Sequence, residues 1–172
     1  MVYHAAMARP RTIPDSTIFA AILRLIAEGG EKAVAFSAVA QATGLSAPSL
    51  VQRYGALPDM IRAALLGEWD RIDALTTAAL ADTATGAKGP QALLKSLSPA
   101  PGPAVLAASL RDAKLRERAR SWRSMVEAAL DQHGGDTDAS AMLFAVWQGQ
   151  TLWDGLGDKG FKLKDAVRRL AQ

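Results

Sequence analysis

The chain has 172 residues, of which 49% are hydrophobic, and it contains no cysteine. This apolar content is enough for a packed core and excludes an intrinsically disordered chain, while the lack of cysteine excludes disulfides and thiolate metal sites. The net charge of +3 is compatible with a polyanionic partner.

Residues 1–14 are interrupted by proline, and we expect them to form a flexible N-terminal arm. Arg9 and Arg11 lie in this arm, where they can reach DNA phosphates or a minor groove; a solvated tail with incidental arginines is the alternative. The segment lacks the apolar run of a signal peptide, and no uncharged apolar stretch reaches the roughly 18 residues of a membrane span. We therefore expect a cytoplasmic protein with no membrane partner.

Helical periodicity runs through almost the whole chain and strand alternation is almost absent, so the sequence predicts an all-α fold. The first helix should follow Pro14 and end at Gly29 and Gly30. Apolar side chains recur on one face of this helix at Ile18, Ala21, Ile22, Leu25 and Ile26. We expect that face to be buried against the two helices that follow.

Residues 36–54 have the pattern of a helix-turn-helix, in which two short helices are joined by a tight turn. Gly44 can take the positive φ that the turn requires, and Ser46 can cap the first free amides of the second helix. The side chains expected to face inward are Val39, Ala40, Leu45, Leu50 and Tyr54. An ordinary helical hairpin is the alternative interpretation.

A long fourth helix should begin at Leu57, because proline is tolerated in a first turn and Asp59 suits the positive end of the helix dipole. Its apolar stripe is expected to be Ile61, Leu65, Trp69, Ile72, Leu75 and Ala79. Breaks rich in glycine and proline then separate a short helix near 91–97, one or two helices over 104–132, a long helix over 138–156 and a last helix over 162–171.

This pattern predicts a helix-turn-helix DNA-binding domain over 15–60, after the arm of residues 1–14, and a helical ligand-binding and dimerisation domain over 61–172. Residues of the first part also match a known family. They are Gly44-Leu45-Ser46 at the helix junction, Ser49-Leu50 in the second helix, Tyr54, and Met60-Ile61 at the start of the fourth helix. At these positions the chain resembles the TetR family of bacterial transcriptional repressors, whereas the remainder agrees only in being helical.

The resemblance implies a transcriptional regulator, expected to be a repressor, that binds a palindromic double-stranded DNA operator as a homodimer and is released by a small apolar ligand. Within the recognition helix, Gln52 is suited to read adenine, and Val51 or Ala47 to touch a thymine methyl group. The full set of predicted DNA contacts is Arg9, Arg11, Thr43, Ser46, Ala47, Ser49, Val51, Gln52 and Arg53.

The two last helices carry more apolar side chains than one interface requires. One stripe is expected to pair with a second copy of the chain in a four-helix bundle, and Gly149 would let the two backbones approach. The predicted dimer residues are Met142, Val146, Gly149, Trp153, Leu163, Val167 and Leu170.

A second apolar face is expected to line a ligand cavity through Trp122, Met125, Phe144 and Trp147, and an ordinary core cluster is the alternative. Polar groups near it are Gln148, Gln150, Asp154 and His133, and the sequence does not choose among them.

Other classes of protein fit the chain less well. His4 and His133 are the only histidines and have no metal-ligand spacing, and no phosphate-binding glycine motif or nucleophile elbow is present. We therefore expect no enzyme activity, cofactor or metal. A helical protein-interaction module with a degenerate helix-turn-helix remains the alternative, because Val51 and Leu57 stand where the family usually has a tyrosine and a lysine that hold the DNA backbone.

Overall fold

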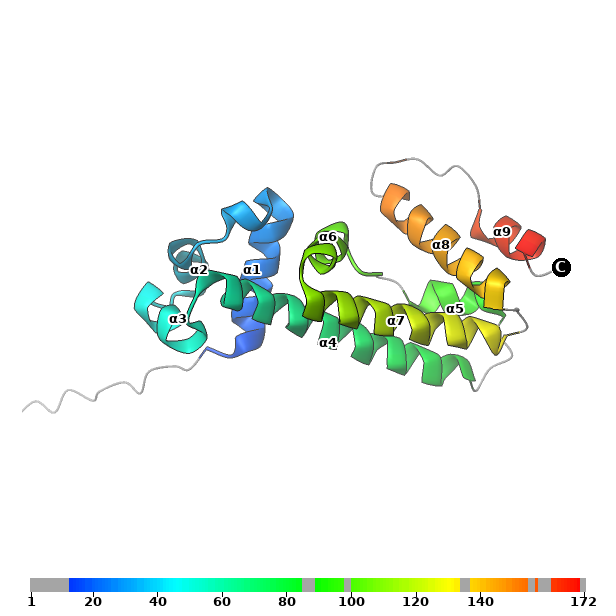
Figure 1. The fold of residues 1–172 in the computed structure, drawn as a ribbon, viewed down its shortest axis with the longest axis horizontal. Coiled ribbons are helices and arrows are strands. Elements are labelled where there is room, and N and C mark those ends of the chain that lie inside the picture. Colours follow the sequence, from blue (N-terminus) through cyan, green and yellow to red (C-terminus); the bar gives the residue numbers. More distant parts are fainter. Residues whose placement is uncertain are drawn as a thin grey trace, which may run out of the picture. The chain divides into compact units, whose positions relative to one another are not determined.

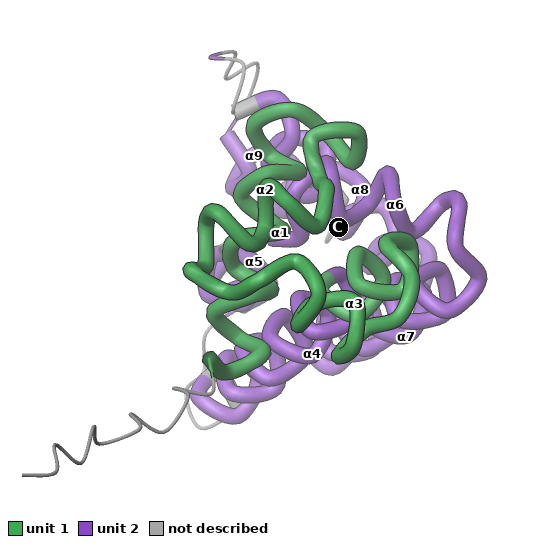
Figure 2. Tube along the Cα trace, turned by 90° about the vertical axis from the view of Figure 1, so that its left-hand side faces the viewer, with its two compact units in different colours: residues 1–64 green, residues 65–172 purple. Residues whose placement is uncertain are grey.

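A computed structural model describes residues 13–84, 89–97, 100–133, 137–154, 157 and 162–170. Every regular element in these residues is a helix, which confirms the predicted all-α fold (Figure 1). The chain divides into two compact units, residues 1–64 and residues 65–172, which Figure 2 distinguishes by colour. None of the described helices is both long enough and apolar enough to span a lipid bilayer.

Unit 1 consists of short helices and the start of a long one. Its elements are α1 (Asp15–Gly29), the 3-10 turn η1 (Glu31–Ala33), α2 (Phe36–Thr43), α3 (Ala47–Tyr54) and the first turns of α4 (Leu57–Ala84). The predicted bounds of α1 and the start of α4 are confirmed, while η1 is an element that the sequence pattern did not indicate.

The turn between α2 and α3 has the backbone geometry that the sequence predicts. Gly44 has φ of 75° in the left-handed region, where its N–H donates to the carbonyl of Ala40 at 2.9 Å and ends α2. Ser46 then caps α3, because its hydroxyl oxygen accepts a hydrogen bond from the backbone N–H of Ser49 at 3.2 Å. The two helices pack together as a helix-turn-helix.

The core of unit 1 lies where α1, α2, α3 and the beginning of α4 meet. Its fully enclosed side chains are Ile18, Ile22, Val39, Leu50, Met60 and Ala64, each 0% exposed. Leu25, Ala40, Leu45 and Tyr54 were expected to be inside and are only half-buried. Four different helices thus contribute to one small hydrophobic core.

Unit 2 contains the remainder of α4 and five further helices. They are α5 (Pro90–Ser96), α6 (Pro103–Arg111), α7 (Ala113–Asp131), α8 (Thr137–Asp154) and α9 (Leu163–Leu170). The region for which one or two helices were expected forms two, because Asp112 leaves helical geometry and caps α7 by accepting from the N–H groups of Lys114 and Leu115. Within the unit, α7 packs against both α6 and α8.

One residue of the predicted α4 stripe is misplaced. Leu75 is 50% exposed, whereas the following residue, Thr76, is 4% exposed. A straight helix drifts relative to any fixed spacing of three and four residues, so the inward face has moved by one position at this point of α4. The prediction that Leu75 is buried is therefore wrong.

The opposed faces of α3 generate a stability prediction. Leu50→Ala removes a fully buried side chain and should lower the free energy of unfolding by about 2–5 kcal/mol, because the core retains a cavity. The adjacent Val51→Ala shortens a side chain that is 45% exposed and should change stability by less than about 0.5 kcal/mol. Urea unfolding followed by circular dichroism measures both. Equal losses in the two variants would contradict the assigned orientation of α3.

Candidate functional site

The outer face of α3 is the first candidate site. The side chain of Leu50 is buried in the core of unit 1 and holds α3 in place. The three residues that follow it, Val51, Gln52 and Arg53, are exposed to solvent. The amide of Gln52 has no hydrogen-bond partner among the described residues. A Gln side chain presents a donor and an acceptor together, which suits it to a base edge in the major groove.

The hydroxyl groups near the start of α3 are occupied locally. The hydroxyls of Ser46 and Ser49 hydrogen-bond to each other at 2.7 Å, and both residues are exposed. Thr43 is half-buried, and its hydroxyl donates to the carbonyl of Val39 at 2.7 Å. Ala47 is half-buried in the first turn of α3. These groups hold the turn together, and only the two serines are exposed to a partner.

Arg53 is held within unit 1. Its guanidinium donates to the carbonyl of Ile13 at 2.8 Å and forms an ion pair with Asp15 at 2.9 Å. The same guanidinium lies 5.7 Å from the centre of the Tyr54 ring. Arg53 was predicted as a phosphate contact, and in the structure its donors serve to join α3 to the start of α1.

Tyr54 completes this junction. Its hydroxyl donates to a carboxylate oxygen of Asp15, and its ring packs against Phe19 with centroids 6.2 Å apart. Burial, together with the bond to Asp15, raises the pKa of Tyr54 above its ordinary value. The phenol is therefore neutral at physiological pH and acts as a fixed donor. Arg9 and Arg11, which were predicted to contact DNA from the arm, lie outside the described residues.

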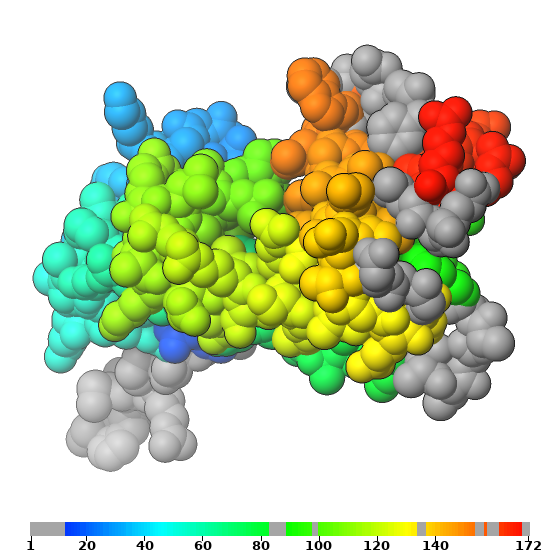
Figure 3. Space-filling model, turned by 45° about the vertical axis from the view of Figure 1, so that its right-hand side comes forward, coloured from blue at the N-terminus to red at the C-terminus, as the bar shows by residue number. Residues whose placement is uncertain are grey.

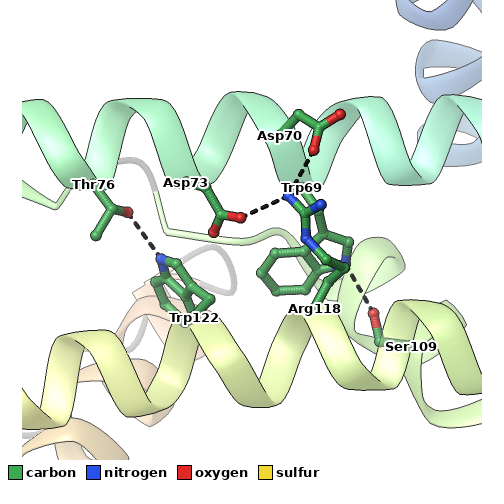
Figure 4. Close-up of polar contacts among 7 residues, drawn as sticks. All are labelled: Trp69, Asp70, Asp73, Thr76, Ser109, Arg118 and Trp122. Carbon is green, nitrogen blue, oxygen red and sulfur yellow. Dashed lines mark hydrogen bonds and ion pairs between the residues drawn. The ribbon is translucent and has the colours of Figure 1, made fainter.

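The second candidate site lies in unit 2, where a polar seam joins α4 to α6 and α7 (Figure 4). The indole N–H of Trp122 on α7 donates to the hydroxyl of Thr76 on α4 at 2.9 Å. The indole N–H of Trp69 on α4 donates to the hydroxyl of Ser109 on α6 at 3.1 Å. Both pairs are buried, so each tryptophan is fixed in one orientation.

An ion-pair cluster extends the seam toward solvent. Arg118 on α7 contacts Asp70 and Asp73 on α4, with nitrogen to oxygen distances of 2.6 Å in both cases. Burial lowers the pKa of Arg118, but the hydrogen bonds that it donates to both carboxylates raise this pKa more, so it lies above its ordinary value. Arg118 is permanently charged and bridges one turn of α4.

Aromatic side chains gather beside this seam. The ring of Trp122 lies 5.6 Å from that of Phe144 and 6.2 Å from that of Trp147, and Phe144 and Trp147 are 6.0 Å apart. Three of the four predicted ligand residues are therefore brought together, whereas Met125 is half-buried elsewhere on α7. Figure 3 shows α7 and α8, which supply the cluster, next to each other.

A cavity of about 500 Å³ opens next to the cluster, between α6, α7 and α8. Of the predicted ligand residues, Trp122 and Phe144 line it, and Trp147 and Met125 do not. Gln148 also lines it, whereas Gln150 and His133 do not, and the side chain of Asp154 lies outside the described residues.

Three arginines of the cavity wall were missed by sequence reasoning. They are Arg116, Arg120 and Arg123 on α7. Their spacing of four and three residues places them on one helix face, which is the signal that was available in the sequence.

The outward face of α8 carries large exposed side chains. Met142 is 55% exposed and Trp153 is 61% exposed, and Val146 and Gly149 lie between them on the same stripe, half-buried. On α9, Leu163 and Val167 are half-buried, and the side chain of Leu170 lies outside the described residues. Exposed apolar side chains in one stripe are typical of an interaction surface.

No protein-family model matches the chain, and the curated proteins contain no match to it. Among solved structures it is similar to the proposed transcriptional regulator SCO7518 from Streptomyces coelicolor A3(2), with 20% identity, coverage of 91% of this chain and 95% of that chain, and a TM-score of 0.64. The multidrug binding protein EbrR, in complex with imidazole, is similar at 20% identity over 92% of this chain and 93% of its own, with a TM-score of 0.65.

A proposed TetR-family transcriptional regulator from Rhodococcus sp. is similar at 18% identity, covering 91% of this chain and 94% of that chain with a TM-score of 0.57. At such identities the likeness concerns the fold. The chain has the all-helical fold found in TetR-family regulators, as the resemblance in its first 65 residues predicted.

The seam between α4 and α7 generates a second prediction. Thr76→Val leaves the buried indole N–H of Trp122 without an acceptor and should lower the free energy of unfolding by about 1–3 kcal/mol. Thr76→Ser keeps the hydroxyl and is the matched control, which should retain more of the stability. Thermal unfolding of both variants tests this. A valine variant as stable as the serine variant would mean that the hydrogen bond does not stabilise the fold.

Proposed function

We propose that this protein is a TetR-like transcriptional regulator that acts in the cytoplasm as a homodimeric repressor. It binds a palindromic double-stranded DNA operator and is released by a small apolar ligand. The observation that carries the proposal is the exposed end of α3, where Val51 and the unpartnered amide of Gln52 stand on a rigidly anchored helix. The fold is shared with structures described as transcriptional regulators, which supports this function.

In the proposed complex α3 enters the major groove. Gln52 reads an adenine with two hydrogen bonds, and Val51 contacts a thymine methyl group. The hydroxyls of Ser46 and Ser49 are positioned at the start of α3 to donate to phosphate oxygens. Arg53 contributes by fixing α3 to the start of α1, because its guanidinium donates to the carbonyl of Ile13 and pairs with Asp15.

The proposed dimer uses α8 and α9. The stripe of Met142, Val146, Gly149 and Trp153 has an exposed residue at each end, and a second copy related by two-fold symmetry can cover it. Apart from its own helix backbone and its two chain neighbours, a Cβ atom added at Gly149 would meet no heavy atom of the described residues within 4 Å. The space at Gly149 is therefore available for close approach of a partner helix.

The proposed ligand site is the cavity between α6, α7 and α8. A volume of about 500 Å³ and walls that include Trp122 and Phe144 suit a small molecule with a large apolar part. Similarity to a structure described as a multidrug binding protein is consistent with a ligand in this unit. The bound ligand favours one conformation of the protein over another, and α4 transmits this change because Trp122 is hydrogen-bonded to it.

A protein-interaction module with weak DNA affinity is the second candidate function. The ion pair between Arg53 and Asp15 favours this second function, because the pair leaves one fewer free cation on the outer face of α3. The two candidates differ in salt dependence. A DNA-binding protein loses affinity steeply as salt rises, whereas a module that recognises protein does not bind duplex DNA specifically.

Capture of genomic fragments by the purified protein, followed by sequencing and titration of the enriched fragment, tests the function. The repressor is expected to bind its enriched fragment at least about 10³-fold more tightly than a scrambled duplex. Equal affinity for the two duplexes would contradict DNA recognition and favour the interaction module.

A substitution at Gln52 tests the reading face. Gln52→Ala should weaken binding to the enriched fragment by about 1–3 kcal/mol and leave the slope against salt unchanged, because a base contact and no phosphate contact is lost. Gln132→Ala removes an exposed glutamine from unit 2 and is the matched control, expected to bind as the unchanged protein does. If both variants retain full affinity, α3 does not read bases through Gln52.

The dimer is tested by sedimentation equilibrium. Trp153→Ala should raise the dimer Kd by about tenfold or more, because buried tryptophans dominate interface energies. Leu75→Ala trims another exposed apolar residue, on α4, and should leave the Kd unchanged. Gly149→Ala should weaken the dimer without destabilising the protomer, since the added methyl has room there. A monomer at all concentrations would contradict the proposed dimer.

A further inference from the structure

The cavity between α6, α7 and α8 is mainly apolar, but several of its lining side chains are positively charged. Its described lining residues include Arg116, Arg120 and Arg123 and no acidic residue. The three arginines lie on one face of α7, and Arg120 and Arg123 are exposed at the rim. The walls below them are apolar, with Trp122 and Phe144 among them.

The three guanidinium groups are engaged to different extents. Arg116 donates to the backbone carbonyl of Leu110 at 2.6 Å, and Arg123 pairs with Glu127 at 2.7 Å while lying 5.4 Å from the centre of the Phe144 ring. Arg120 has no hydrogen-bond or ion-pair partner among the described residues. The rim therefore keeps positive charge that the described residues do not neutralise.

A second, independent feature lies in the wall of the same cavity. The side-chain amide oxygen and nitrogen of Gln148 are both buried and have no hydrogen-bond partner among the residues that the structure describes. Two uncharged polar lining groups are satisfied, because the indole N–H of Trp122 donates to Thr76, and the hydroxyl of Ser109 donates to the carbonyl of Val105 and accepts from the indole N–H of Trp69. A buried amide without partners is unfavourable, and a polar atom of a ligand can satisfy it.

We propose that the cavity binds an amphipathic organic acid. Its aromatic or aliphatic body lies against Trp122 and Phe144, its carboxylate pairs with Arg120 at the rim, and a polar atom of the body hydrogen-bonds to Gln148. This inference rests on the proposed function only in treating the cavity as the effector site. A lipophilic cation is disfavoured, because it would place a second positive charge beside three arginines and find no acid in the described wall.

A matched ligand series tests the charge selectivity directly. Biphenyl-4-carboxylate, biphenyl-4-carboxamide and biphenyl-4-ylmethylamine share one apolar body and differ in head group charge. Isothermal titration calorimetry with the full chain at pH 7.5 is expected to give the acid an affinity at least about tenfold above that of the amine, as expected for charge-assisted hydrogen bonds. Higher salt should reduce the preference for the acid.

Variants then assign the preference to the cavity. Arg120→Gln should weaken binding of the acid by about tenfold and leave the neutral amide unchanged. Lys114→Gln is the matched control, since it removes the same charge from an exposed position of α7 that does not line the cavity. Gln148→Met keeps the side-chain length and should weaken binding of 4′-hydroxybiphenyl-4-carboxylate, whose hydroxyl supplies the polar atom of the body, without weakening that of biphenyl-4-carboxylate.

Equal binding of acid and amine, or equal effects of the Arg120 and Lys114 substitutions, would overturn the acid selectivity while leaving a ligand cavity in place. Absence of heat with all three compounds would overturn the inference entirely. Failure of the DNA capture experiment with intact acid selectivity would instead count against the regulatory function alone. The two proposals therefore fail by different observations.

Discussion

The hydrogen bond from the indole N–H of Trp122 to Thr76 fixes the orientation of α7 relative to α4, and the packing of the other helices in unit 2 depends on that orientation. It ties α7 to α4 at 2.9 Å, and both partners are buried. The same indole packs against Trp69 of α4 and against Phe144 and Trp147 of α8. Because a buried indole N–H needs an acceptor, the rotation of α7 about its axis is restricted to the one that aims Trp122 at Thr76.

That restriction also shapes the cavity. With Trp122 held by α4, one side of its ring is left to line the space between α6, α7 and α8, which Arg116, Arg120 and Arg123 of the same helix also line. A ligand against Trp122 would touch a residue that is bonded to α4, the helix that begins with Leu57 directly after α3. In the proposed function this helix is the two-state element that ligand and DNA both bias.

The sequence was most informative where a single residue has a single structural task. The left-handed turn was predicted from Gly44, and the cap of α3 was predicted from Ser46. The buried side of α3 was predicted from Leu50. In the long helices periodicity identifies an apolar face but not the element it meets, so Leu75 was placed inside in error and Thr76 was missed. The partner of Arg53 is 38 residues away in the chain, at Asp15, which no local pattern encodes. Likewise, the rings of Trp122, Phe144 and Trp147 predicted a cluster, while the division between core and cavity wall depends on how α6, α7 and α8 pack.

The central claim is that occupation of the cavity beside Trp122 alters DNA binding by α3. It is tested most directly by measuring the affinity for the captured DNA fragment, by fluorescence anisotropy, without ligand and with saturating biphenyl-4-carboxylate. Coupling energies of this kind correspond to changes of about 5- to 150-fold, and the account predicts weaker DNA binding within that range when the acid is bound. An unchanged DNA affinity at full occupancy of the cavity would contradict it.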